Sequence, residues 1–285
     1  MDTYQQFQEK LNLLLEDIDP DTLSYNKNEY WMIQADYEYV EYYAYKHQLL
    51  YTAIALPLAR GLHDGDHRKS TLMKNDITYR LPYVIHPLQV CRMLIDLQLP
   101  LPREDEDILL AAALCHAMIE DIPFLDHGKE LMVQYHLPVR VYEIVKTVSK
   151  RKDFTEEEEL NHFQEIAHDP LATLIKLSDR GNNVEDLYNR SFWKVHEYVG
   201  ETKKYFIPIC AYGIKHHEEL RPAIMVLRDK IFCLTDAAEI LVDRYHEREE
   251  QLKSRIEELK QENASLRETW RGMWPHPDIA FGRED

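Results

Sequence analysis

Residues 108–121 read ILLAAALCHAMIED, an apolar run that ends in a histidine and two acids. The run predicts a helix that is capped upstream by Asp105 or a nearby acid and ends before Pro123. Because residues four apart share a face of a helix, His116 and Glu120 are expected on one side of it. This stretch therefore predicts a packed helix that carries polar side chains at its C-terminal end.

Two further helices are predicted on either side of this one. Proline favours the first turn of a helix, so a helix beginning at Pro87 would place His86 at its entrance. Residues 171–187 form another predicted helix, in which Asp179 and Asn183 are four residues apart. Only 8 glycines among 285 residues and few alternating apolar–polar runs leave little room for a sheet. The predicted fold class is all-α.

Composition narrows the possible classes of function. With 45% hydrophobic and 30% charged residues the chain is typical of soluble globular proteins, and no run approaches the roughly 18 apolar residues of a membrane span. A net charge of -17 argues against general nucleic-acid binding. The first residues lack the basic and apolar regions of a signal peptide, and the 4 cysteines form no C-x-x-C pair. We expect a cytoplasmic protein with no membrane and no nucleic-acid partner.

His86, His116 and Asp179 offer two imidazoles and a carboxylate from separate predicted helices. This donor set suits Mn²⁺, Fe²⁺ or Zn²⁺, although a single helical histidine is more often a hydrogen-bonded core residue. Glu120 and Asp121 place two more acids one turn beyond His116. The combination favours a hydrolytic divalent-metal site over a plain helical bundle.

Four short motifs follow one another along the chain: HRKS at 67–70, PYVIHP at 82–87, the stretch 109–123, and LIKLSDR at 174–180 with Asn183 beyond it. In this order and at these separations they resemble the HD-domain phosphohydrolases, and within that family the RelA/SpoT-type alarmone hydrolases. The resemblance covers about residues 45–235. It implies a helical HD-domain bundle and removal of the 3′-pyrophosphate from guanosine tetra- and pentaphosphate.

The resemblance implies roles in catalysis for five matching residues. His86, His116 and Asp179 would be metal ligands, with Mn²⁺ as the first candidate and Fe²⁺ or Zn²⁺ as alternatives. Glu120 and Asp121 match the acidic pair that orients or deprotonates the attacking water. When bound, such a metal polarises a phosphoryl oxygen and lowers the pKa of its water.

The resemblance also implies contacts with a purine nucleotide. Arg68 and Lys69 match a basic pair beside the nucleotide, where a guanidinium can stack on a base and an ammonium can meet phosphate. Asn183 matches a polar residue that lines the same pocket. Residues 146–152 carry four cations, and Lys150 among them is a candidate phosphate contact, with a solvated charge cluster as the alternative.

The chain departs from the family pattern at two places. Position 117 is Ala where the family has an Asp ligand, which should reduce metal affinity and turnover by large factors. Because the other motif residues are present, a deliberate inactivating substitution is favoured over a decayed enzyme. In addition, residues 71–80 are inserted between Lys69 and Pro82 as an expected loop, which would either reshape substrate choice or be an irrelevant surface loop.

The chain is predicted to have four parts: an N-terminal helical extension at 1–44, the HD domain at 45–235, a coiled-coil helix at 236–270 and a tail at 271–285. Heptads place Val242, Glu249, Ile256, Asn263 and Trp270 at a, and Ala238, Tyr245, Leu252, Leu259 and Leu266 at d. This pattern predicts a parallel homodimer through the C-terminal helix. The alternative is an amphipathic helix folded back on its own domain.

The leading functional hypothesis is metal-dependent hydrolysis of a (pyro)phosphorylated purine nucleotide, (p)ppGpp-like alarmones of the stringent response first, impaired by Ala117. One alternative is a catalytically inactive nucleotide sensor or an antitoxin-like interaction module. Another keeps the metal site and changes the substrate to, for example, a nucleoside monophosphate or NADPH.

Overall fold

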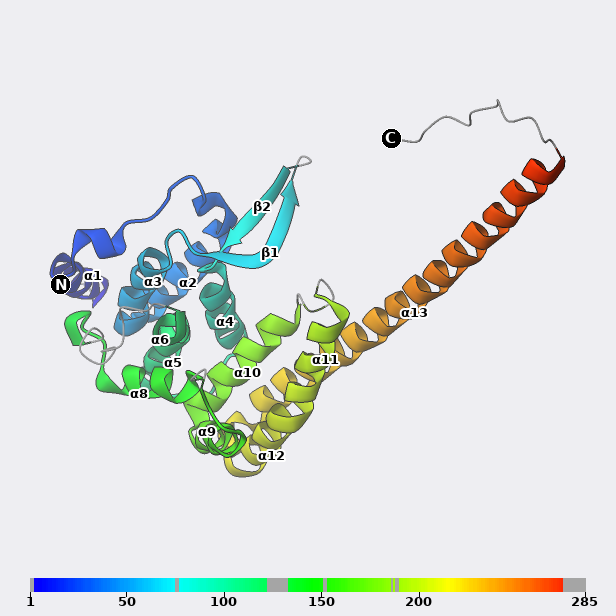
Figure 1. Cartoon of the computed structure of the whole chain (residues 1–285). Helices are drawn as coiled ribbons and strands as arrows, with labels where there is room; N and C mark the ends of the chain where they lie inside the picture. Colours follow the sequence, from blue (N-terminus) through cyan, green and yellow to red (C-terminus); the bar gives the residue numbers. More distant parts are fainter. Residues whose placement is uncertain are drawn as a thin grey trace.

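The computed structural model describes residues 3–74, 77–121, 133–150, 153–185, 187 and 190–273, without the side chains of residues 3, 69–74, 77, 120 and 121. Over this part the chain is almost entirely helical, so the predicted all-α fold class is confirmed (Figure 1). No described helix combines the length and the apolar character needed to cross a lipid bilayer.

The elements follow the order of the sequence. The first half contains α1 (Thr3–Glu16), η1 (Pro20–Leu23), η2 (Tyr30–Met32), α2 (Gln34–His47), α3 (Leu50–Leu62), β1 (His67–Lys74), β2 (Ile77–Pro82), α4 (Ile85–Asp96), α5 (Arg103–Cys115) and α6 (Met118–Asp121). The second half contains α8 (Val139–Val148), α9 (Glu156–His168), α10 (Pro170–Glu185), α11 (Phe192–Glu201), η5 (Thr202–Phe206), α12 (Ile207–His216), η6 (Glu218–Leu220) and α13 (Arg221–Met273).

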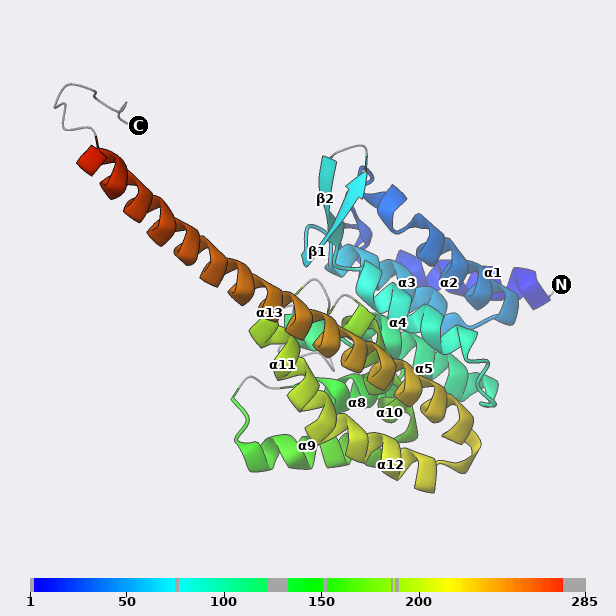
Figure 2. The same ribbon diagram turned by 90° about the vertical axis from the view of Figure 1, so that its right-hand side faces the viewer.

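The core lies between α3, α4, α5, α8 and α10, which pack against one another in the body of the molecule (Figure 2). Helix α5 is its centre, because residues 109–115 are all at most 1% exposed. The three alanines at 111–113 have no bulk beyond a methyl group, so neighbouring helices can approach the α5 backbone closely. The packed helix predicted from this stretch is present.

A buried carboxylate joins α5 to the start of α3. Asp107 accepts hydrogen bonds from the backbone amides of Tyr51 (3.0 Å) and Thr52 (2.7 Å) and from the Thr52 hydroxyl (2.8 Å). Amides in the first turn of a helix have no partner within that helix, so Asp107 satisfies two of them. The contact fixes the position of α5 relative to α3 and, through α5, that of the residues that follow.

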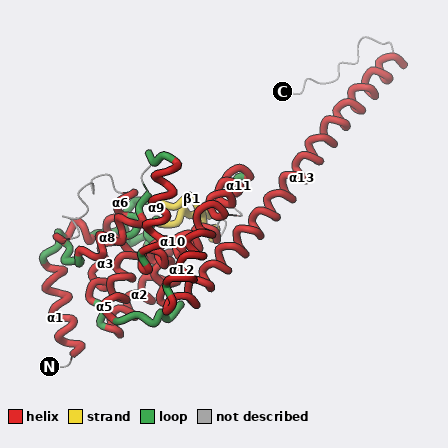
Figure 3. Tube along the Cα trace, turned by 90° about the horizontal axis from the view of Figure 1, so that it is seen from below, coloured by secondary structure: helices red, strands yellow, loops and turns green. Residues whose placement is uncertain are grey.

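Residues 71–74 and 77–80 of the inserted segment form the paired arms of a β-hairpin instead of the expected loop. Strand β1 pairs antiparallel with β2, from Thr71 opposite Arg80 to Lys74 opposite Ile77. Figure 3 shows these strands as the single sheet in the described part of the chain. The sequence carries a signal for this hairpin, because β-branched and aromatic residues flank an Asn-Asp pair.

The continuous helix predicted up to residue 119 is interrupted. Helix α5 ends at Cys115, and α6 begins only at Met118. His116 lies at the break, where its Nδ1 atom lies 2.7 Å from the carbonyl oxygen of Ala113. The expectation that His116 and Glu120 belong to one continuous helix is therefore wrong, and the side chain of Glu120 lies outside the described part of the structure.

Helix α13 contains 53 residues, and its two halves have different surroundings. Its first half packs against α10, α11 and α12, and Ala238 and Val242 are buried there. Every residue from 247 to 273 is exposed, and this half projects from the body (Figure 1, Figure 2). The alternative in which this helix folds back on its own domain is therefore wrong for residues 247–273.

The predicted N-terminal extension, coiled-coil segment and tail can be compared with the helices at the two ends of the chain. Within the predicted N-terminal extension, Phe7 and Leu11 of α1 are buried in the main core. The coiled-coil segment predicted to begin at residue 236 is part of a helix that already begins at Arg221. Of the predicted tail, residues 274–285 lie outside the described part of the chain.

Candidate metal centre

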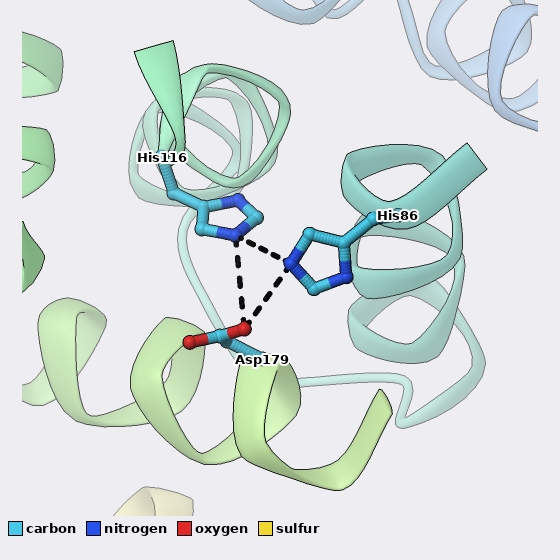
Figure 4. Close-up of side chains that lie close together, drawn as sticks. All are labelled: His86, His116 and Asp179. Atoms are coloured by element: carbon cyan, nitrogen blue, oxygen red, sulfur yellow. Dashed lines mark hydrogen bonds and ion pairs between the residues drawn. The ribbon is translucent and has the colours of Figure 1, made fainter. Parts of the chain in front are cut away.

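Three elements carry the side chains that meet in the candidate site. His86 is the second residue of α4, His116 lies between α5 and α6, and Asp179 lies within α10. The three side chains point toward one another, and one potential ligand atom of each lies within 4.8 Å of the other two (Figure 4). Both imidazoles are buried, and the Asp179 side chain is 15% exposed.

Hydrogen bonds determine which nitrogen of each imidazole faces the centre of the site. Arg68 donates to Oδ1 of Asn182 over 2.9 Å, so this amide oxygen is an acceptor, and Nδ1 of His86, 2.7 Å away, carries a proton toward it. Nδ1 of His116 donates in the same way to the carbonyl oxygen of Ala113. In its neutral form each imidazole then presents an unprotonated Nε2 atom to the centre, as a metal ligand does.

The centre of the site therefore gathers acceptor atoms. The Nε2 atoms of His86 and His116 lie 3.1 Å apart, and Oδ1 of Asp179 lies 3.2 Å from the first and 4.0 Å from the second. Burial, and then the neighbouring His86, lower the pKa of His116 to about 4, so this imidazole is neutral at pH 7. The lone pairs of acceptor atoms this close repel one another unless a cation lies among them. These two nitrogens and one oxygen are therefore suitable ligands for a divalent cation.

Two polar residues of α10 also contact the carboxylate of Asp179. Asn183 donates to Oδ1 of Asp179 over 2.6 Å, and the Lys176 ammonium lies 3.5 Å from Oδ2. Lys176 also donates to the carbonyl oxygen of Val148 over 3.2 Å. Burial raises the pKa of Asp179, but the Lys176 ammonium and the neighbouring imidazoles outweigh it and hold this pKa well below its usual range. Asp179 is therefore ionised beside a fixed cation.

A cavity of about 140 Å³ opens onto these groups. It is lined by Tyr83, His86, His116, Ala117, Val148, Ile175, Lys176, Asp179 and Asn183. Ala117 is 5% exposed and contributes only a methyl group to the wall. A carboxylate at this position would add a negative charge to a wall that now holds one carboxylate and one ammonium, so the substitution changes the charge of the cavity as well as the number of ligands.

Two residues predicted to contact the nucleotide lie at the site. Asn183 lines the cavity, and Arg68 donates to Oδ1 of Asn183 over 3.3 Å in addition to its bond with Asn182. The guanidinium of Arg68 is thus anchored on two asparagines of α10. Arg68 therefore adds a positive charge near the site, and through Asn182 it also helps to orient the imidazole of His86.

The remaining predicted site residues have different outcomes. Lys150 forms an ion pair with Glu159 of α9 and is not among the described residues that line the cavity. The side chains of Lys69, Glu120 and Asp121 lie outside the described part of the structure, so their roles stay predictions.

Three residues of the site were not predicted from the sequence. Lys176 and Tyr83 line the cavity, and Asn182 orients His86. For Lys176 a signal existed, because it lies three residues before Asp179 on one helix and residues at this spacing are neighbours. For Asn182 none existed, since its partners come from segments far away in the sequence.

No protein-family model matches the chain. The chain is 31% identical, over 161 residues, to a guanosine-3′,5′-bis(diphosphate) 3′-pyrophosphohydrolase of Vibrio cholerae serotype O1. The match covers 54% of this chain but only 20% of the length of that relative. Over about half of its length this chain is therefore similar to one part of a hydrolase that acts on a phosphorylated nucleotide.

Proposed function

We propose that this chain is a divalent-metal-dependent phosphohydrolase of the HD-domain type. The convergence of His86, His116 and Asp179, with the Nδ1 atom of each imidazole turned toward an acceptor oxygen, is the observation that carries the proposal. The similarity to a guanosine-3′,5′-bis(diphosphate) 3′-pyrophosphohydrolase points to a purine nucleotide with a 3′-pyrophosphate as the first substrate to test. Mn²⁺ is the first metal to test, with Fe²⁺ and Zn²⁺ as alternatives.

The residues of the site would have different roles in such a reaction. His86, His116 and Asp179 would hold the metal, which when bound supplies a Lewis acid and lowers the pKa of a water molecule. Lys176 places a positive charge at the edge of the cavity, where it would balance the negative charge of a phosphoryl group. Arg68 holds Asn182 and thereby keeps the imidazole of His86 in its orientation.

Ala117 supports a second candidate function, a nucleotide-binding module without turnover. With a methyl group at position 117, the cavity wall combines Asp179 with Lys176, so its charges nearly balance before Arg68 is counted. Such a wall repels a phosphate less than one with two carboxylates. A sensor or an antitoxin-like protein would use the pocket in this way.

Restoring the carboxylate distinguishes the two functions. We expect the Ala117→Asp protein with Mn²⁺ to release pyrophosphate or phosphate from at least one member of a panel of guanosine and adenosine 3′-phosphorylated nucleotides, nucleoside monophosphates and NADPH. The unchanged protein serves as the reference for rate, and Ala117→Asn serves as the control for side-chain size without charge. If Ala117→Asp binds Mn²⁺ yet hydrolyses none of the panel, the hydrolase proposal is wrong and the binding module is the better account.

A further inference from the structure

The projecting half of α13 exposes a largely apolar stripe along one face. The d-position residues along it are half to three-quarters exposed, with Leu259 at 47% and Tyr245 at 74%. The a positions Ile256 (51%) and Trp270 (65%) add to the same stripe. A lone helix of this kind leaves its apolar side chains in water, so a second helix that covers the stripe would stabilise it.

The base of the same stripe is already covered by another helix of the chain. Val195 and Val199 of α11 form a buried cluster with Ala238 and Val242, which occupy the first d and a positions of the stripe. Phe192 stacks on His246 at a ring distance of 4.2 Å, at the point where the cover ends. Beyond this point the stripe is open.

Helix α11 runs antiparallel to α13. Phe192, at its start, meets His246, whereas His196, one turn later, bonds to Asp243 over 2.9 Å. Still later, Lys203 pairs with Glu239 over 3.3 Å. The numbers fall along α13 as they rise along α11, so the covering helix has a defined direction.

We propose that residues 245–270 of α13 pair with the same segment of a second copy of this chain in antiparallel orientation. The second helix would then run in the same direction as α11, and its residue 270 would lie close to Phe192, where α11 begins and its cover of the stripe stops. The two bodies would lie at opposite ends of a rod about 40 Å long, at 1.5 Å per residue. In the parallel dimer predicted from the heptads, by contrast, the α11 helices of both copies would lie between the two α13 helices at their base and force them apart.

The charges beside the stripe agree with this orientation. In a parallel in-register dimer, Arg248 would face Lys253 of the second copy, and Arg255 would face Lys260, which are repulsive pairs on both sides of the seam. Only the pair of Glu262 with Arg267 would be attractive, so repulsive contacts outnumber attractive ones.

In the antiparallel dimer centred on Ile256 opposite Leu259, the balance of charges is even. Arg255 then faces Glu262 of the second copy twice, and Lys253 faces Lys260 twice. Two polar residues within the stripe, Glu249 and Asn263, would face leucines in this register. We therefore expect a dimer of modest affinity, with dissociation in the micromolar range.

Cysteine cross-linking tests the orientation directly in the full chain. In a Cys233→Ser background, Tyr245→Cys and Trp270→Cys are made as separate proteins with tags of different size. In the antiparallel dimer these two positions face each other, whereas positions 245 of the two copies lie roughly 37 Å apart. We expect a disulfide dimer that contains one of each protein in the oxidised mixture, and none in either protein alone.

The remaining outcomes overturn the proposal. Cross-linking of each variant with itself would establish the parallel dimer. If no cross-link forms and the protein is a monomer in sedimentation equilibrium, the chain does not pair with itself, and a different protein must cover the stripe. As a matched pair, Leu259→Asp is expected to abolish the dimer and Gln261→Asp, on the outer face of the same helix, to preserve it. Equal dissociation by both would mean that charge alone, and not the stripe, controls association.

Discussion

The Nε2 atoms of His86 and His116 lie 3.1 Å apart, and each imidazole is held in place through its Nδ1 atom. The bond of His86 goes to an amide whose oxygen is fixed by Arg68, and the bond of His116 goes to a backbone carbonyl. The two rings are thus already oriented for the cation that we propose binds here. Organisation of this kind lowers the cost of binding, because ligands need not reorient.

The hydrogen bond that Nδ1 of His86 donates to Asn182 should matter for metal affinity. Asn182→Leu removes the acceptor of Nδ1, so the ring loses its fixed tautomer and orientation, and we expect Mn²⁺ affinity to fall by about 10- to 100-fold. Isothermal titration with Mn²⁺ measures the change. The matched control is Asn161→Leu on the exposed side of α9. An equal loss in both variants would refute this role.

Lys176 should affect metal and anion binding in opposite directions. Its ammonium lies 3.5 Å from Oδ2 of Asp179, so Lys176→Met removes a charge that repels a metal and attracts a phosphate. We expect tighter Mn²⁺ binding and weaker binding of a purine nucleotide in the presence of a chelator. Lys146→Met, at an exposed position of α8, is the control for total charge. A change of the same sign for both ligands would contradict the assignment.

In the Ala117→Asp protein, Arg68 and Glu120 should affect different kinetic constants. A positioning cation acts already in the ground state, whereas an acid–base group acts in the transition state. Arg68→Ala should therefore chiefly raise KM, and Glu120→Gln should chiefly lower kcat. Steady-state kinetics on the substrate found in the panel decides this, and the reverse pattern would show that the two roles are wrong.

Arg180 should be important for stability. The residue is 5% exposed. Its guanidinium carbon lies 4.2 Å from the centre of the Phe206 ring and 4.6 Å from the centre of the Tyr198 ring, and the guanidinium pairs with Glu201 over 2.9 Å. We expect Arg180→Met to lower the free energy of unfolding by about 2 kcal/mol, less than for a fully buried pair because Glu201 is 35% exposed.

Urea unfolding of the Arg180→Met protein checks this value. The double variant with Glu201→Gln should lose less than the sum of the two single variants, because both remove the same ion pair. Strict additivity would mean that the pair itself contributes nothing.

His162 should make the protein less stable in mild acid. Burial, and then the nearby cations Lys176 and Lys150, lower the pKa of His162 to about 4, whereas in the unfolded chain it is about 6.5. The unfolded state therefore binds a proton that the folded state does not bind between these values. The resulting stabilisation is complete above about pH 6.5 and is lost as the pH falls toward 4.

The variant that tests this linkage is His162→Phe, which keeps a ring at the position and removes the titration. Its free energy of unfolding, measured between pH 7.5 and pH 4.5, should fall less steeply than that of the unchanged protein. A slope equal to that of the unchanged protein would show that His162 does not contribute.

The sequence alone determined the helical class and the packed centre of the fold. The run of eight apolar residues that ends at Cys115 is buried throughout, as the absence of any polar residue within it indicates. It also pointed to His86, His116 and Asp179, which the structure brings together. These features could be predicted because they depend on residue type and on spacing within one segment.

The tertiary structure decided what depends on contacts between distant segments. Asn182 reaches His86 and Arg68 only after α10 has packed beside α4 and the hairpin, so no local pattern could reveal the tautomers of the site. In the same way, heptads show that the C-terminal stripe needs a cover, but they do not show that α11 already covers its base. Periodicity records which face of a helix is apolar. Which neighbour covers that face, and in which direction it runs, follows only from the packing of the whole chain.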